Sequence, residues 1–136
     1  MGRGVTRVDG RIAYLNTDLD LTSPQDLTGL AGAFGSRGMY ALHVARRDDG
    51  MWHATLETDP QHGEPERTIA AMLAAIESLG KLDRAMWDAC TEREFNIGYD
   101  CGDEPWAFNQ GLSFGLLGRI ASARASLRIT LYPNRA

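Results

Sequence analysis

A β-hairpin is the feature that most constrains how this chain can fold. The stretch MYALHVARRDDGMWHATLETD places two alternating, largely apolar runs on either side of the loop Asp48-Asp49-Gly50. A type I turn with Gly50 in the left-handed bulge position pairs Arg47 with Met51. A two-residue loop would divide the apolar side chains between the two faces, so the three-residue loop is favoured. The resulting register predicts the pairs Val44–Ala54 and Leu42–Leu56 and an apolar face of Leu42, Val44, Trp52, Ala54 and Leu56.

Three further stretches have the alternation of half-buried strands. They are RIAYLNTDLDL at 11–21, the segment 95–101 and the C-terminal run SLRITLY. In the first of them, Tyr14 falls among the polar positions and is expected on the exposed face. The side chains expected to point into the core are Ala13, Leu15, Leu19, Leu21, Phe95, Ile97, Tyr99, Cys101, Leu127, Ile129 and Leu131.

Helical patterns fill the segments between these strands. The first helix is predicted to begin at Ser23 as N-cap with Pro24 in its first turn, and to be ended by Gly35 and Gly38. The second begins at Pro65 and ends at Gly80. A shorter helix over 81–92 and a third before the last strand complete the set. The expected buried positions are Leu27, Leu30, Ala31 and Phe34, then Ile69, Met72, Leu73, Ile76 and Leu79, then Leu82, Met86 and Cys90, and finally Leu112, Leu116 and Ile120.

These patterns predict an α+β fold in one domain. A chain of 136 residues is long enough to bury a core without metal or disulfide support. Alternating strands favour a single, mainly antiparallel sheet of about five strands, with the helices on one face and a polar face opposite. We expect a ferredoxin-like core with an added α-β unit. Residues 1–10 are predicted to be a flexible segment and residues 11–136 the domain.

Composition and charge exclude several functional classes. The net charge of -4 and the scattered basic residues argue against a nucleic-acid surface. No apolar run is long enough to span a bilayer, and the N-terminus has no signal-peptide pattern, so a cytoplasmic protein without membrane contact is expected. Cys90 and Cys101 have no zinc-finger spacing and are read as reduced thiols. The sequence predicts no catalytic residue, metal or cofactor by motif.

The predicted polar face is the first candidate site. In the hairpin register, His43 faces Thr55 and lies diagonal to both His53 and Glu57. Two imidazoles and a carboxylate on one strip suit a metal or an acid/base pair, although a solvated sheet face has the same composition. Asp18 and Asp20 point to one side of their strand and suit paired carboxylates or a role before a helix N-terminus. The remaining candidate contacts on this face are Tyr14 and Asp100.

The second candidate is the loop in FNIGYDCGDEPWAFNQGL, where Trp106 and Phe108 follow an acidic, glycine-containing turn. Connecting loops are usually polar, so two large aromatic residues require an explanation. We expect this loop to fold back as a lid over the core, in which case Trp106→Ala would lower stability by about 3–5 kcal/mol. The alternative is a contact surface for a partner or ligand.

The segments EFNIGYDCGDEPWAF and SLRITLYP resemble families of uncharacterised small bacterial proteins. The resemblance covers most of the chain. It implies no activity and assigns no functional residue.

The sequence therefore favours a non-enzymatic interaction module of the immunity or regulatory type, because the domain is acidic and lacks a catalytic motif. A protein partner is expected, and a homo-oligomer is compatible with this interpretation. One alternative is a small metal-dependent hydrolase that uses Asp18, Asp20, His43, His53 and Glu57. Another is a small-ligand-binding protein with Trp106 in the pocket wall.

Overall fold

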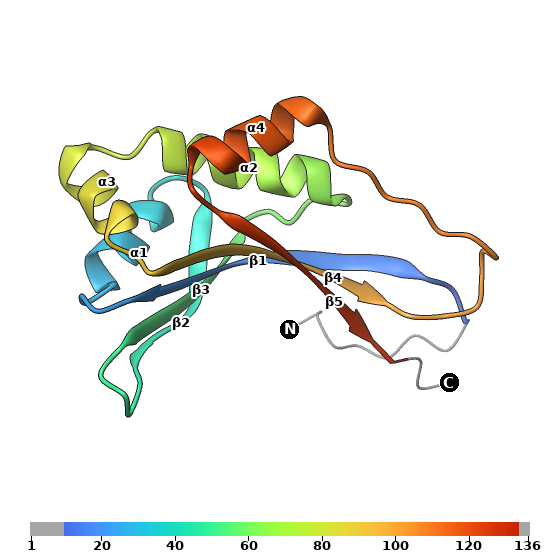
Figure 1. Ribbon diagram of the computed structural model, residues 1–136, viewed down its shortest axis with the longest axis horizontal. Coiled ribbons are helices and arrows are strands. Elements are labelled where there is room, and N and C mark those ends of the chain that lie inside the picture. The colour runs from blue at the N-terminus through green and yellow to red at the C-terminus, as the bar shows by residue number, and fades with distance from the viewer. Residues whose placement is uncertain (1–9, 134–136) are drawn as a thin grey trace.

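The structure is a computed structural model that describes residues 10–133 (Figure 1). The predicted flexible segment, 1–10, lies outside the described residues except for Gly10. The elements follow one another in the predicted sequence of strands and helices. They are β1 (Ala13–Ser23), α1 (Thr28–Gly35), β2 (Met39–Arg46), β3 (Trp52–Thr58), α2 (Pro65–Glu77), α3 (Lys81–Asp88), β4 (Glu92–Asp100), α4 (Phe114–Ser122) and β5 (Ser126–Tyr132).

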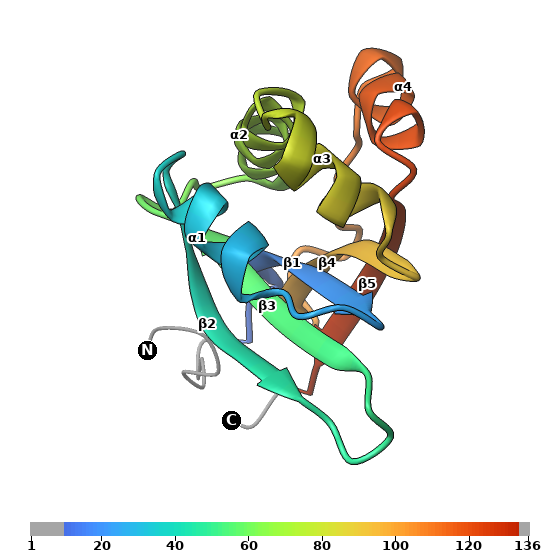
Figure 2. The same cartoon turned by 90° about the vertical axis from the view of Figure 1, so that its left-hand side faces the viewer.

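The strands form one sheet in the order β2-β3-β1-β4-β5. β1 is antiparallel to both β3 and β4, and β2 is antiparallel to β3, whereas β4 and β5 run parallel. Parallel neighbours need a crossover connection, which α4 supplies. The helices lie on one face of the sheet (Figures 1 and 2). The predicted α+β class is confirmed, and the sheet is mixed because of its one parallel pair.

The hydrophobic core lies between the sheet and the helices. α2 follows the predicted 3.6-residue period and buries one full stripe, which the alternating faces of β1, β3 and β4 meet. Burial of these side chains is the main favourable term in folding. The core side chains from these four elements with no more than 1% exposure are Leu19, Leu21, Ala54, Leu56, Ile69, Met72, Leu73, Ile76 and Phe95.

The hairpin has the predicted loop. The backbone N–H of Arg47 donates to the carbonyl of Met51 at 2.8 Å, and the N–H of Gly50 donates to the carbonyl of Arg47 at 2.9 Å. Val44 faces Ala54, as predicted. The predicted Leu42–Leu56 pair is wrong, because a register shift lies at Leu42 and Leu56 faces Ala41 instead.

A second register shift, between Tyr14 and Asn16, corrects the face assigned to Tyr14. The extra residue, Leu15, reverses the alternation, so Tyr14 lies on the helix side. Its hydroxyl hydrogen-bonds with Thr17 at 2.8 Å and donates to Thr68 of α2 at 3.1 Å. Burial raises the pKa of Tyr14. Tyr14 is therefore not part of the polar face, where the sequence placed it.

Three helices differ from expectation. Leu112, predicted on the helix before the last strand, lies outside α4, which begins at Phe114. α1 begins at Thr28 and not near Pro24, because Ser23 ends β1 and the Asp26 carboxylate accepts the Thr28 N–H at 2.8 Å. In α3 the predicted inward residue Leu82 is 83% exposed, whereas Trp87 is fully buried. The Trp87 indole donates to the carbonyl of Ala123 at 3.0 Å, next to the end of α4. This hydrogen bond and its packing orient α3 with Trp87 inward.

The last strand is the largest departure from the predicted core. Leu127, Ile129 and Leu131 lie beside core residues of β4 but are 39%, 65% and 62% exposed. β5 is the last strand of the sheet, so these side chains have a strand neighbour on one side only. These side chains lie on the predicted face of the sheet, the one that the helices cover, but they are not buried there.

Candidate functional site

The loop 101–113, between β4 and α4, is held at its β4 end by residues 10–12. The N–H of Ile12 donates to the carbonyl of Glu104 at 2.7 Å, and the N–H of Asp103 donates to the carbonyl of Gly10 at 3.0 Å. A Cβ atom on Gly102 would collide with the backbone of Gly10. Only glycine permits this close approach without a shift of one segment.

The other end of the loop is attached to α2. Ser113 donates its backbone N–H and its hydroxyl to the two carboxylate oxygens of Glu66, at 2.9 and 2.7 Å. These hydrogen bonds lower the pKa of Glu66. The Ser113 hydroxyl also accepts the N–H of Leu116 and so caps α4. Both ends of the loop are therefore fixed to other parts of the fold.

Trp106, near the middle of this loop, is 97% exposed. The predicted lid is therefore wrong for Trp106. Attachment to residues 10–12 carries the loop beyond the end of β4 and not across the core (Figure 1). Phe108 packs edge-to-face on Tyr99 with 5.6 Å between ring centroids, and it is 38% exposed. Phe108 thus provides the aromatic packing that the sequence assigned to both residues.

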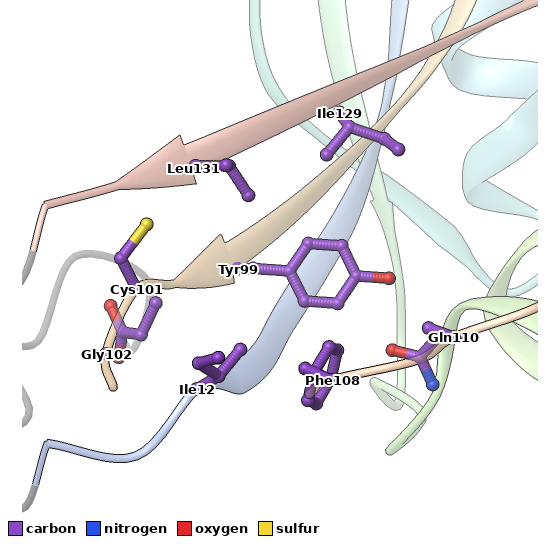
Figure 3. Close-up of a pocket in the computed structure, with 9 residues that line it drawn as sticks. Ile12, Tyr99, Cys101, Gly102, Phe108, Gln110, Ile129 and Leu131 are labelled. Atoms are coloured by element: carbon purple, nitrogen blue, oxygen red, sulfur yellow. The ribbon is translucent and has the colours of Figure 1, made fainter. Parts of the chain in front are cut away.

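A cavity of about 390 Å³ lies between this loop and the sheet (Figure 3). Tyr99 and Phe108 form one part of its wall, and Ile129 and Leu131 of β5 form another. Gln110 adds a polar group. Among the described residues, no hydrogen bond involves the Tyr99 hydroxyl. Cavities of roughly 300–1,000 Å³ with apolar walls and a few polar groups are typical of ligand sites.

The polar face opposite the helices contains most of the other predicted site residues, but several are buried. Asn16 joins two of the carboxylates, because its side-chain amide donates to Asp18 at 2.9 Å and to Glu57 at 2.8 Å. Glu57 also accepts from Tyr40 at 2.8 Å and from Gln61 at 3.0 Å. The hydrogen bond to the Glu57 carboxylate raises the pKa of Tyr40. These side chains form a hydrogen-bonded cluster and not a solvated surface.

Asp20 and the two histidines lie along the same face. The Thr55 hydroxyl donates to Asp20 at 2.7 Å, and Thr55 faces His43 as predicted. His43 Nε2 and His53 Nδ1 are hydrogen-bonded at 2.9 Å. Burial, followed by the charge of Arg47, lowers the pKa of His53. Within residues 10–133, no three His, Cys, Asp or Glu side chains are grouped closely enough to hold a metal ion.

Asp100 ends β4 and is 8% exposed. Its Oδ2 atom is buried and has no hydrogen-bond partner among residues 10–133. Strand alternation directs the Asp100 side chain away from the face of Tyr99. Asp100 nevertheless belongs to the residues that line the cavity, next to Tyr99 and Cys101. Asp100 remains a predicted contact residue.

The structure thus brings Asp18 to Glu57 and His43 to His53. Tyr14 lies on the helix side but lines a small pocket together with Asn16 and Glu57. Trp106 is exposed on the loop 101–113. Sequence reasoning missed the linking role of Asn16 and the contribution of β5 to a cavity. A signal for the first was the spacing of Asn16 and Asp18 on one strand face. The cavity had no local signal in the sequence, because it depends on where the loop 101–113 lies relative to β4 and β5.

Comparison of the chain with protein-family models, curated proteins and solved structures finds no match. The resemblance to small bacterial proteins therefore rests on the two sequence segments alone. Within residues 10–133, no helix has the length and apolar character needed to cross a membrane.

Proposed function

We propose that this protein is a non-enzymatic interaction module that binds a protein partner through the loop 101–113. The observation that carries the proposal is Trp106, which is 97% exposed on a loop fixed at both ends. Tryptophan is enriched among the few residues that dominate binding energy at interfaces. A fixed backbone also reduces the entropy lost when the loop binds.

The surroundings of Trp106 indicate what kind of partner fits. Asp103 and Glu104 are exposed on the same loop, and the chain has a net charge of -4. A partner with an apolar centre and basic residues around it would match both the indole and the carboxylates. The neighbouring cavity, lined by Tyr99 and Phe108, is large enough to receive one apolar side chain of that partner.

A small-ligand-binding protein is the second candidate. Its support is the cavity itself, whose volume of about 390 Å³ and mainly apolar wall suit a small molecule. The metal-dependent hydrolase has less support, because the Asp18 and Glu57 carboxylates are hydrogen-bonded through Asn16. Stoichiometric zinc binding that is lost in a His43→Ala/His53→Ala double variant would favour the hydrolase.

Two finer expectations accompany the proposal. A ferredoxin-like core with an added α-β unit is supported by the antiparallel part of the sheet, in the order β2-β3-β1-β4, to which α4 and β5 are joined. A cytoplasmic setting is supported by the two free cysteines, Cys90 and Cys101.

Capture of binding partners from the native host tests the proposal. Immobilised wild type, Trp106→Ala and Leu82→Ala would be compared at equal amounts of folded protein. Leu82 is a matched control, because it is 83% exposed but lies on α3. We expect one specific protein to bind wild type and Leu82→Ala alike. Its affinity for Trp106→Ala should be about thirtyfold weaker, because truncating such an anchor costs about 2 kcal/mol or more. Equal binding to all three proteins would reject the proposed surface.

A further inference from the structure

The outer edge of β5 is a second exposed surface, distinct from Trp106. Three apolar side chains, Leu127, Ile129 and Leu131, alternate along it and are 39–65% exposed. In the described chain, β5 has β4 as its only strand neighbour. We propose that a second copy of this chain pairs with this edge, β5 against β5 and antiparallel, with Ile129 on the two-fold axis.

The backbone N–H and C=O groups of β5 point in the directions that such a pairing needs. The carbonyl of Tyr132 accepts the N–H of Cys101 at 2.9 Å, so Tyr132 directs its backbone groups toward β4. Because the direction of these groups alternates along a strand, those of Leu127, Ile129 and Leu131 point to the outer edge. Unpaired groups of this kind are a template for another strand.

The register follows from the length of the strand. Ile129 is the midpoint of β5, so a two-fold axis there gives every residue of Ser126–Tyr132 a partner in the second copy. Ile129 then faces Ile129 of the second copy, and Leu127 faces its Leu131. These are the residues whose backbone groups point outward, so each facing pair exchanges both hydrogen bonds. Apolar side chains face apolar side chains along the whole seam.

Charge favours the same register. Arg128 lies on the opposite face of β5, and its guanidinium is bound to Glu94 at 2.7 Å. With Ile129 on the axis, Arg128 faces Thr130 of the second copy. An axis at Arg128 would place two guanidinium groups opposite each other. It would also centre the pairing on a residue whose backbone groups point toward β4 and not toward the second copy. The strand is therefore complementary to itself in one register.

The two edges of the sheet differ in their protection against such pairing. β2, the other edge, is interrupted by the register shift at Leu42 and ends in Arg46, which is followed by Arg47. Bulges and exposed charges are the features that commonly block edge association. β5 pairs with β4 without a register shift, and its one charged residue is held by Glu94.

α4 supplies further apolar area. It lies on the β5 side of the molecule, away from β2 (Figure 2). Phe114 and Leu117 of α4 are 92% and 43% exposed. Antiparallel pairing in one continuous sheet places the helices of both copies on the same face, so the two α4 helices flank the seam. Stable interfaces bury about 1,200–2,000 Å², more than one strand pair provides, so these side chains belong to the proposed contact.

Light scattering after size-exclusion chromatography tests the association. Wild type should have about twice the mass of one 14.9 kDa chain and should dissociate on dilution. Ile129→Lys places two like charges on the axis and should weaken dimerisation at least about a hundredfold, or about 2.7 kcal/mol. Circular dichroism and thermal unfolding should show that the variant stays folded, because position 129 is 65% exposed. Leu82→Lys on α3 is the control and should remain dimeric.

A wild type that stays monomeric at millimolar concentration overturns the proposal, as does an Ile129→Lys variant that still forms dimers. A monomeric wild type would leave the proposed binding through Trp106 standing, because the indole lies on the loop 101–113 and not on β5. Trp106→Ala should remain dimeric.

Disulfide cross-linking tests the register. In a Cys101→Ser background, Ile129→Cys places each thiol opposite its own copy, at a Cα separation of about 5.5 Å, which a disulfide can bridge. Mild oxidation should link this variant as a dimer. Leu127→Cys should not be linked, because it faces Leu131 of the second copy. Efficient linking of Leu127→Cys but not of Ile129→Cys would reject the register.

Discussion

Asn16 is the residue on which the polar cluster depends. It lies over Gly98 of β4, where a Cβ atom would crowd the Asn16 amide. The missing side chain at position 98 leaves room for one amide to bridge the buried carboxylates of Asp18 and Glu57. Buried charges are tolerated only when hydrogen bonds satisfy them, so this amide stabilises the region.

Replacing Asn16 with Ala should lower the free energy of unfolding by about 2–4 kcal/mol, because two hydrogen bonds to buried carboxylates are lost. Denaturant unfolding at neutral pH would measure this loss. Asn96→Ala is a matched control on the same face, since Asn96 is half-buried and accepts one hydrogen bond from Thr130. A loss no larger than that of Asn96→Ala would contradict the bridging role.

The two cysteines should differ in reactivity. Burial raises the pKa of Cys90 from an ordinary 9.0 to about 11, whereas Cys101 is partly exposed beside the cavity. At pH 8 a thiol reagent should modify Cys101 rapidly and Cys90 only after unfolding. The Cys90 contribution to stability is fully present below pH 9 and is lost as the pH rises toward 11, because the unfolded chain then ionises first. Equal modification rates in the native protein would contradict this assignment.

At the scale of elements, turn chemistry made the hairpin predictable. The residue types of Asp48-Asp49-Gly50 are those of a three-residue hairpin loop, with glycine in the left-handed position. The helical spacing of apolar residues in α2 likewise predicts which side chains are buried. The register shifts at Leu15 and Leu42 were not predictable, because the apolar and polar residues around each inserted residue still alternate in the sequence. The inward face of α3 was also missed, since it depends on a carbonyl at the distant end of α4.

The candidate site was predictable only in part. The aromatic residues in an acidic loop identified the loop 101–113 from the sequence, but the lid interpretation was wrong for Trp106. The path of a loop depends on what holds its ends. This loop is held by residues 10–12 and by Glu66, which are distant from it in the sequence. The exposure of β5 could not be predicted either, because the alternation of apolar and polar residues does not show whether a strand lies at the edge of its sheet.

The close approach of Gly102 to Gly10 holds the loop against residues 10–12, and a substitution at Gly102 tests this attachment. Gly102→Ala should lower the free energy of unfolding by about 1–3 kcal/mol, because its Cβ forces residues 10–12 and the loop apart. Gly111→Ala, in the same loop, is the control, since its Cβ would meet no atom within 4 Å. Thermal or denaturant unfolding distinguishes them. Equal stability of the two variants would show that the loop is not held at Gly102.

The whole molecule is asymmetric. Its helices cover one face of the sheet (Figure 1), its two edges differ in protection, and its most exposed aromatic residue, Trp106, lies on the loop 101–113. Core residues and a hydrogen-bonded polar cluster stabilise the β1–β3–β4 region. Apart from Tyr40 of β2 and Leu82 of α3, the large apolar side chains that remain exposed in the described residues lie on the loop 101–113, α4 and β5. These three places are where partner binding and self-association are proposed.

Trp106 is proposed to serve binding and not folding. Denaturant titration of Trp106→Ala and of wild type tests this role, because it compares their free energies of unfolding. Because the indole is 97% exposed, we expect the two free energies of unfolding to differ by no more than about 0.5 kcal/mol, as for surface substitutions in general. A decrease of about 3–5 kcal/mol, the cost of truncating a buried aromatic residue, would show instead that Trp106 belongs to the core.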